Sequence, residues 1–287
     1  MRYVSDLVES KEYDFAVEKL RMFFRSKGFI EVPTQHRLSI LAACEDPSTI
    51  AIITYAGKTW PLPQTGQMWL EYELLKDPSV PGFYCTGASF RQEPEPIKGR
   101  HNLTFPMFEF ETKGDMNTLL ALEKELITFL DIGYAANGKS TEQIEIDYRE
   151  IARAYGVSEL KAEHEKRMWE EYGPVIFLKH FPMHTSPFWN MKNDCVAANK
   201  IDVILYGMET IGSAERGVDP EEMRRQFNTI SDGMYKKILF SHFEKERVEE
   251  ELEEFLSFKF FPRCGGGIGM TRFIRALKLA GHLPEHL

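Results

Sequence analysis

The sequence predicts an α+β fold, and three kinds of pattern support that prediction. Alternation in period two between Phe90 and Glu111 indicates two strands joined by a hairpin loop. Apolar residues recur at helical spacing in residues 12–27 and 118–134. A further helical pattern follows a glycine run at 265–269. With 287 residues, the chain is long enough for one large α/β domain or two small ones.

The first of these elements is the helix expected at 12–27. Gly28 is placed to end it, because glycine adopts the left-handed conformation of a helix C-terminus at no steric cost. Residues 29–32 read Phe-Ile-Glu-Val and predict a strand. The pattern of residues 12–27 fits equally an N-terminal amphipathic helix that packs on the core of its own chain.

The hairpin at 90–111 carries charged and aromatic residues at alternating positions, so one of its faces can hold Arg91, Glu93, Phe105 and Glu109. Such a face suits a nucleotide. A guanidinium matches phosphate oxygens, and an aromatic ring stacks on a base that arginine covers from the other side. A salt-bridged surface hairpin has the same spacing, so the pattern alone leaves both interpretations open.

Three later segments also have helical character. Residues 118–134 are expected to close at Gly133 or soon after, and 147–173 are expected to be helical and polar after a turn-like stretch at 136–145. Seven glutamates occur in the eleven residues 244–254, with apolar residues interleaved. That run predicts an amphipathic helix with a solvated acidic face.

Four glycines fall within residues 265–269, where the missing Cβ atoms allow a ligand or another element to approach closely. The helical pattern that follows places Arg272 in a first helical turn, facing whatever lies above the glycine strand. No Gly-Lys-Ser/Thr follows, so the P-loop pattern is not met. The remaining residues hold no βαβ unit of a Rossmann fold.

Composition limits the cellular location, the cysteine chemistry and the partners that can be expected. There is no run of 18 apolar residues and no apolar signal segment at the start, which predicts a soluble, cytoplasmic protein with no membrane partner. The four cysteines are scattered without a CxxC pair, which argues against a zinc site and a disulfide framework and favours buried thiols. A net charge of −9 weighs against tight binding to a polyanion.

Together, the hairpin and the glycine strand resemble motifs 2 and 3 of the class II aminoacyl-tRNA synthetases, in the aspartate, asparagine and lysine subgroup. Residues 12–34 resemble motif 1 of that family, although Pro33 precedes Thr34 instead of following it. Three more segments match in order: Gln64–Glu71 resembles the amino-acid-binding segment, Phe177–Pro182 with Pro187 and Phe188 resembles the strand before the metal-binding region, and Ile201–Leu205 with Glu209–Arg216 resembles that region itself.

The resemblance implies an antiparallel sheet flanked by helices, with residues 1–287 forming a single catalytic domain. A small helical insertion is expected at about 136–173, between motifs 2 and 3. Motif 1 builds a dimer interface in the family, so a homodimer is expected. The family's anticodon-binding domain precedes motif 1, where this chain has too few residues to hold it, so no such domain is expected.

The same resemblance assigns ATP and Mg²⁺ as cofactors. Arg91 would hold the α-phosphate and the amino-acid carboxylate, and Arg272 would hold the γ-phosphate, which makes them the catalytic pair. The remaining ATP contacts would be Glu93 with the adenine amine, Phe105 stacked on adenine, Arg100 or His101 on the terminal phosphates, and Gly267 and Gly269 beneath the adenosine. Asp202 and Glu209 would hold Mg²⁺, which prefers one or two carboxylates plus substrate phosphates.

The amino acid would be bound by Gln64, Gln67, Glu71 and Arg216. Leu70 stands where an aspartate-type site has lysine, whereas Leu70-Glu71 looks more like the asparagine type. Thr271 replaces the usual glutamate before the motif 3 arginine. Aspartate, asparagine and close analogues therefore all remain open as substrates.

Three functions follow from this resemblance. The first is an AMP-forming ligase that passes an aminoacyl-adenylate to ammonia or a small amine, as in the archaeal-type asparagine synthetase. The second is a truncated synthetase that charges tRNA or another acceptor. The third is a binding paralogue without catalysis, which the presence of Arg91, Glu93, Phe105, Glu209 and Arg272 disfavours.

Overall fold

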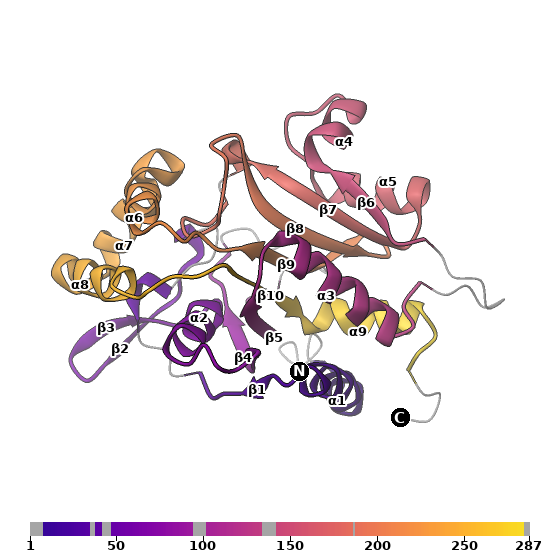
Figure 1. Ribbon diagram of the computed structural model, residues 1–287, viewed down its shortest axis with the longest axis horizontal. Helices are drawn as coiled ribbons and strands as arrows, with labels where there is room; N and C mark the ends of the chain where they lie inside the picture. Colours follow the sequence, from indigo (N-terminus) through magenta and orange to yellow (C-terminus); the bar gives the residue numbers. More distant parts are fainter. Residues whose placement is uncertain are drawn as a thin grey trace.

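The computed structural model describes residues 8–34, 38–41, 47–93, 102–133, 142–185 and 187–283. Its centre is an eight-stranded sheet in the order β1-β4-β5-β10-β9-β8-β7-β6 (Figure 1). The sheet strands are β1 Ile30–Glu31, β4 Gly82–Phe90, β5 Thr104–Lys113, β6 Ile144–Asp147, β7 Val175–Pro182, β8 Ala197–Leu205, β9 Met208–Glu215 and β10 Arg263–Gly269. A separate two-stranded sheet pairs β2 Ile52–Tyr55 with β3 Lys58–Pro61.

The sheet is antiparallel from β4 to β7, as expected, but its two outermost pairs, β1 with β4 and β6 with β7, are parallel. The parallel pairs arise because helical segments separate these strands along the chain, and crossovers of that kind can return a strand in the same direction. The helices are α1 Ser10–Ser26, α2 Gln67–Lys76, α3 Met116–Phe129, α4 Tyr148–Tyr155, α5 Ala162–Tyr172, α6 Pro220–Thr229, α7 Met234–His242, α8 Lys245–Leu256 and α9 Met270–Leu279.

One face of the sheet is covered by α1, α3 and α9, which lie together in Figure 1 and share one hydrophobic core with it. Alternation along β5 decides which side chains join that core. Phe108 and Phe110 are fully buried in it, so Met107, Glu109 and Glu111 point to the opposite face. That opposite face is where the polar side chains of the central strands gather.

Most of the predicted elements are confirmed. The helix expected at 12–27 is α1, and Gly28 follows it with φ +79°, as its C-terminal role requires. The predicted strand at 29–32 is the short β1. The predicted hairpin is formed by β4 and β5, but β4 ends at Phe90, where its alternation was expected to begin, so Arg91 and Glu93 follow the strand and do not lie in it. The acidic run forms α8, in which Val248, Leu252 and Phe255 are buried.

The helix expected at 118–134 ends earlier than predicted, at Phe129. Asp131 adopts φ +53°, and the Ile132 N–H turns back to the Ile127 carbonyl at 3.2 Å. A left-handed residue followed by this bond closes a helix. Aspartate tolerates that conformation better than most residues, but sequence spacing carried no signal for it here.

The helical region expected at about 136–173 contains β6, α4 and α5 in its described part, while 136–141 lie outside the described residues. These elements have a core of their own, in which Tyr148, Ile151 and Met168 pack against Ile176 and Leu178 of β7. They extend one edge of the sheet and do not line the site described below. Their status as an insertion stays a prediction.

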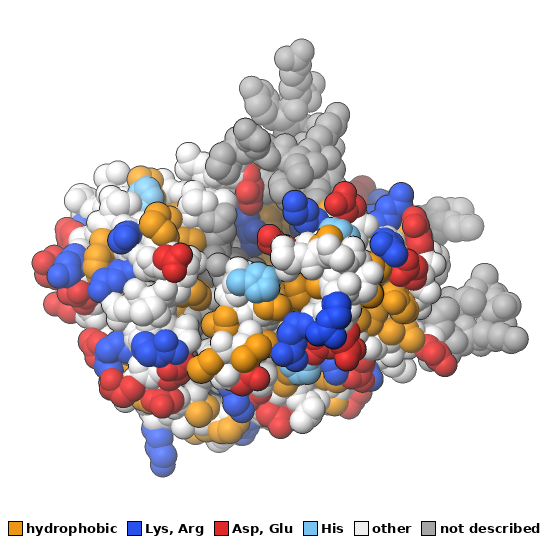
Figure 2. Space-filling view, turned by 90° about the horizontal axis from the view of Figure 1, so that it is seen from above, with side chains coloured by type: hydrophobic (Ala, Val, Ile, Leu, Met, Phe, Trp, Pro, Cys, Tyr) orange, Lys and Arg blue, Asp and Glu red, His pale blue; other side chains and the backbone are white. Residues whose placement is uncertain are grey.

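Among the described residues, no helix is long and apolar enough to cross a membrane. Acidic and basic side chains are interspersed over the face shown in Figure 2, notably at the end that carries α6 and α8. Helices α6 and α8 are joined by the ion pair Arg224–Glu253, and α6 also holds the pair Arg225–Glu222.

The expectation of buried thiols is confirmed for Cys85 and Cys264 but is wrong for Cys195, which is exposed. Cys195 sits in a tight turn with φ +70°, where its N–H is bonded to the Asn193 side chain. The turn holds this side chain away from the core. Cys44 lies outside the described residues.

Glu123 of α3 is buried at the core side of the sheet and has no ion-pair partner in the described part of the chain. Burial raises the pKa of its carboxyl to about 8. Its value in the unfolded chain is about 4.3. As pH rises, the carboxyl therefore loses its proton in the unfolded chain before it does so in the folded protein. The free energy of unfolding falls between the unfolded-state pKa and the folded-state pKa.

We therefore expect the free energy of unfolding to fall less steeply from pH 5 to pH 8 in Glu123→Gln than in the unchanged protein. The amide stays neutral throughout, so the proton-linked loss of stability disappears. Urea unfolding at pH 5, 6, 7 and 8 measures this, with the exposed Glu163→Gln as a control. Parallel pH profiles for both variants would contradict an ionisable Glu123 in the core.

Candidate active site

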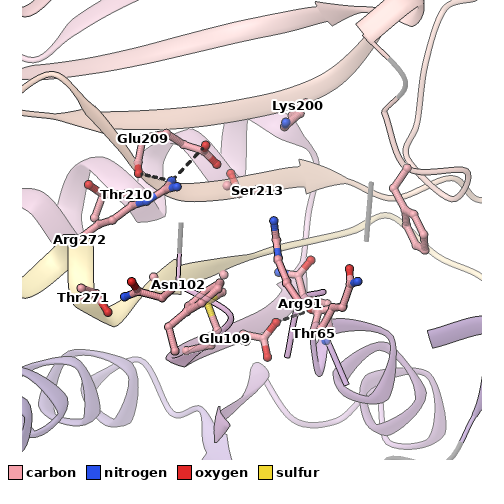
Figure 3. A pocket seen from close by; sticks show the side chains of 18 of the residues that line it. Thr65, Arg91, Asn102, Glu109, Lys200, Glu209, Thr210, Ser213, Thr271 and Arg272 are labelled. Atoms are coloured by element: carbon pink, nitrogen blue, oxygen red, sulfur yellow. Dashed lines mark hydrogen bonds and ion pairs between the residues drawn. The ribbon is translucent and has the colours of Figure 1, made fainter. Parts of the chain in front are cut away.

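A cavity of about 470 Å³ opens over the polar face of the sheet. Two ends can be distinguished. The helix end holds Glu209, Thr271, Arg272 and Arg275, and the amide end holds Gln64, Gln67, Glu71 and Arg216. Figure 3 shows Arg272, Thr271 and Glu209 on one side of the cavity, and Arg91 and Thr65 on the other.

The floor of the cavity is the glycine strand β10. In register, Gly267 lies between Glu109 of β5 and Gly212 of β9, and Gly265 lies between Glu111 and Ala214. A Cβ at Gly265 would overlap the Glu111 carboxylate and the Phe110 carbonyl. The predicted close approach is therefore confirmed at Gly265, where the group that approaches is a buried carboxylate.

The face predicted for the hairpin is present. Arg91, Glu93, Phe105 and Glu109 all line the cavity, with the Arg91 guanidinium carbon 5.7 Å from the centre of the Phe105 ring. The Arg91 and Glu93 side chains form an ion pair at 4.0 Å. Arg91 therefore presents its charge to the cavity from between a carboxylate and an aromatic ring. Arg100 and His101, the other predicted phosphate contacts, lie outside the described residues.

Arg272 occupies the first turn of α9, as predicted, and points into the cavity. Its Nη1 donates to the Glu209 carbonyl at 2.9 Å and lies 3.4 Å from Glu209 Oε2, a contact drawn in Figure 3. Gly267 and Gly269 line the floor nearby. The helix end thus holds a partly exposed arginine against one of the two carboxylates predicted to bind Mg²⁺.

The second of those carboxylates, Asp202, is buried beside Glu209. A Cβ placed on Gly212 would lie 3.2 Å from Glu209 Oε1 and 3.7 Å from Asp202 Oδ1, so both carboxylates border the same point above this glycine. Lys200 and Arg272 are their cationic neighbours, at 3.5 and 3.4 Å. No group of three or more metal-ligating side chains occurs among the described residues. A carboxylate pair fits Mg²⁺, which takes its other ligands from water and substrate phosphates.

At the amide end, two glutamines present unsatisfied groups. Gln64 donates from Nε2 to Thr49 Oγ1 at 2.9 Å, and its buried Oε1 has no partner. Gln67 accepts from Arg216 Nη2 at 2.8 Å through Oε1, and its buried Nε2 has no partner. Within the described residues, one acceptor and one donor are therefore left over in the cavity wall. Buried polar atoms of this kind normally have a partner, so a ligand is the natural one here.

Arg216 belongs to a buried network of two arginines and two glutamates. It binds Glu111 through Nε at 3.2 Å and Nη2 at 3.0 Å, while Arg263 Nη2 lies 2.6 Å from Glu71 Oε2. Burial raises the pKa of Glu111, and Arg216 opposes that shift. The other Glu71 oxygen accepts from Asn190 at 2.6 Å. Glu71 therefore supports the pocket wall beneath Arg216, with both of its oxygens already engaged.

Sequence patterns missed several residues of the site. The buried network is completed by Glu111, Arg263 and Asn190. A second missed contact is that of Thr65, which donates to Glu109. The Oε2 atom of Glu109 also accepts from the Gly66 N–H at 2.7 Å. Glu111 could have been found, because it follows Glu109 on the same face of its strand. Nothing in the sequence pairs Arg263 with Glu71, which lies 192 positions away.

A family model for class II tRNA synthetases specific for aspartate, lysine and asparagine matches residues 13–282. The chain belongs to this family. The predicted resemblance is therefore confirmed, and so is the class II catalytic fold with its sheet flanked by helices. Members of this family are ATP-dependent ligases, which agrees with the arginines and the glycine floor of the cavity.

Two curated relatives are an asparagine–tRNA ligase from Pelotomaculum thermopropionicum and an aspartate–tRNA(Asp) ligase from Pyrobaculum aerophilum. The first is 25% identical over 304 residues, covering 92% of this chain and 64% of the relative. The second is 21% identical over 287 residues, covering 91% and 62%. The chain thus spans slightly less than two thirds of the length of these relatives.

Among solved structures, the chain is similar to asparaginyl-tRNA synthetase from Pyrococcus horikoshii complexed with asparaginyl-adenylate. The TM-score is 0.75 at 21% identity, and the match covers 94% of this chain and 65% of that one. An asparaginyl-tRNA synthetase from Entamoeba histolytica matches with a TM-score of 0.73 at 17% identity, covering 93% and 63%. At these identities the likeness concerns the fold alone.

Proposed function

We propose that this protein activates a small polar amino acid by joining it to ATP as an aminoacyl-adenylate, with release of pyrophosphate. One observation carries the proposal. A single cavity has arginines suited to phosphate on its walls, Arg91 and Arg272, and two glutamines with buried, unsatisfied polar atoms at its amide end. A nucleotide and an amino acid can therefore meet over the same glycine floor.

Adenylate formation brings a carboxylate to an α-phosphate, so both reactants are anionic and the transition state gains charge at phosphorus. Arg91 lies on the amide side of the cavity and would hold the two together. Fixed donors aimed at developing charge typically contribute about 3–4 kcal/mol each. Mg²⁺, held by Asp202 and Glu209, would neutralise the phosphates. Arg272 would hold the γ-phosphate, in exchange for part of its contact with Glu209.

Charge balance favours asparagine over aspartate. In the buried network at the amide end, Arg216 and Arg263 face Glu71 and Glu111, so two positive charges meet two negative ones. A substrate carboxylate would add an uncompensated buried charge there, whereas an amide adds none. An amide also offers both a donor and an acceptor to Gln64 and Gln67. Three of the four proteins described above are asparagine–tRNA ligases or asparaginyl-tRNA synthetases by name, which agrees with this choice, and the fourth is an aspartate–tRNA(Asp) ligase.

For the acceptor we propose tRNA, because the relatives are tRNA ligases. This reverses the order expected from the sequence, where the net charge of −9 favoured ammonia or a small amine. No described residue of the cavity argues for an amine acceptor over a ribose hydroxyl. We further propose that the protein is a homodimer that uses the motif 1 segment at 12–34.

Pyrophosphate exchange tests the proposed activation. We expect exchange to require Mg²⁺ and asparagine, with kcat/KM for asparagine exceeding that for aspartate by on the order of 10-fold or more. Labelled asparagine should then appear in acid-precipitable tRNA. If the protein forms a free amide with ammonia and charges no tRNA, the acceptor is an amine, as the sequence favoured. Release of ADP in place of AMP would rule out the adenylate.

A further inference from the structure

A second arginine stands beside Arg272 on the cavity side of α9. Thr271, Arg272 and Arg275 all line the cavity, and their spacing of one, three and four residues places them on one side of the helix. The opposite side, with Phe273 and Ile274, is buried in the core. The orientation of Arg275 toward the cavity is therefore imposed by the packing of the helix.

Arg275 and Thr271 both carry buried polar atoms without a partner among the described residues. Arg275 donates from Nη2 to the Tyr206 carbonyl at 3.2 Å, but its Nη1 makes no hydrogen bond. The hydroxyl of Thr271 is likewise unpartnered. Burial lowers the pKa of the Arg275 guanidinium, and no acidic side chain in the described part of the chain offsets that shift. Arg216, by contrast, has its pKa raised by Glu111 and Glu71 in spite of its burial.

The helix itself adds to this local positive potential. Gly269 is the N-cap residue of α9 and offers no side chain to accept from the N–H groups of the first turn. Those N–H groups and the positive end of the helix dipole favour an anion nearby. Three side-chain donors and the start of a helix therefore converge on the same end of the cavity.

We propose that Thr271 and Arg275 form a subsite for the terminal phosphate oxygens of the nucleotide, next to Arg272. The ligand must be an acceptor, since Arg275 Nη1 can only donate. It is anionic, because the guanidinium of Arg275 is half-buried and forms no ion pair with the described residues, and an anion accepts the stronger hydrogen bond. The phosphates of ATP are the anions proposed to bind at this end of the cavity, beside Glu209 and Arg272. The identity of that ligand rests on the proposed function.

Calorimetric binding of ATP, inorganic tripolyphosphate and AMP to the complete protein tests this subsite. In Arg275→Met, we expect affinity for ATP and tripolyphosphate to fall about 10-fold, the loss typical of one charged hydrogen bond. Affinity for AMP should be unchanged. Arg275→Lys should restore part of the loss, and Thr271→Val should reproduce a smaller part of it. Arg224→Met, which removes a partly exposed, ion-paired arginine on α6, is the matched control.

Two results would overturn the subsite. One is unchanged affinity for ATP and tripolyphosphate in Arg275→Met, or in Thr271→Val if the former does not fold. The other is an equal loss for AMP, which would mean that Arg275 acts only by supporting the Tyr206 turn. If the unchanged protein binds ATP but forms no adenylate with any amino acid, the proposed function fails while the subsite stands. If the first of these two results is accompanied by weakened tRNA binding, Arg275 is assigned to nucleic acid.

Discussion

Replacing Arg91 by alanine is expected to lower the turnover of adenylate formation by on the order of 10²-fold or more. The guanidinium lies between Glu93 and the Phe105 ring and faces the cavity. A group that bridges a carboxylate and the phosphorus it attacks interacts most strongly in the transition state. The KM for ATP should therefore change much less than kcat, and the rate of pyrophosphate release from ATP, measured over a range of ATP concentrations, separates the two.

Arg91→Lys is the companion variant, because it keeps the charge but loses the planar fork of donors. We expect its rate to lie between those of the unchanged protein and Arg91→Ala. Circular dichroism and thermal unfolding should be unchanged in both, since Arg91 lies outside the hydrophobic core. An effect confined to the KM for ATP would contradict the bridging role and leave Arg91 as a ground-state nucleotide contact.

The largest loss of stability is expected from Arg263→Met. Arg263 is 0% exposed and is paired with Glu71, whose other oxygen is held by Asn190. Removing it leaves Glu71 and Glu111 buried with Arg216 as the remaining arginine of their network. Breaking a buried pair on one side costs about 3–5 kcal/mol, because the partner charge stays desolvated. Urea unfolding at pH 7 measures this directly.

A double variant separates the lost pair from lost packing. In Arg263→Met with Glu71→Gln, no unpaired charge remains at this position, so we expect recovery of a substantial part of the stability. At the partly exposed Arg224, replacement by methionine should change stability by about 1 kcal/mol or less, in spite of its two ion pairs. Equal losses in the single and double variants would mean that side-chain packing, and not charge, dominates at Arg263.

The elements that could be predicted from the sequence are those whose signal is local. Period-two alternation located β5, and the glycine run with its apolar continuation located β10 and α9. The alternation misplaced the first strand of the hairpin, because β4 ends at Phe90, where the alternation was expected to begin. Most of the described side chains predicted for the cavity line it, while Asp202 is buried next to it. For strand residues such as Phe105 and Glu109 the reason is sheet alternation, which sends every second residue to one face. Arg100 and His101 fall outside the described residues, so their predicted phosphate contacts stay predictions.

What could not be predicted depends on pairings between distant segments. Glu71 was expected to contact the substrate, yet both of its oxygens are engaged by Arg263 and Asn190, which come from other parts of the chain. Asp131 ends α3 early through a backbone conformation that aspartate permits but does not require. The unpartnered atoms of Arg275 and Thr271 likewise become visible only once α9 is packed against the sheet.

Transfer of an isotope label tests the joining of carboxylate to α-phosphate most directly. With asparagine carrying ¹⁸O in its α-carboxylate, each completed turnover should leave one ¹⁸O atom in AMP, since the carboxylate oxygen that attacks phosphorus stays with it when the acceptor takes the acyl group. Mass spectrometry of the nucleotide products reads this out. AMP containing one ¹⁸O is the predicted result, and ADP with the label in inorganic phosphate, or unlabelled AMP, would contradict the account.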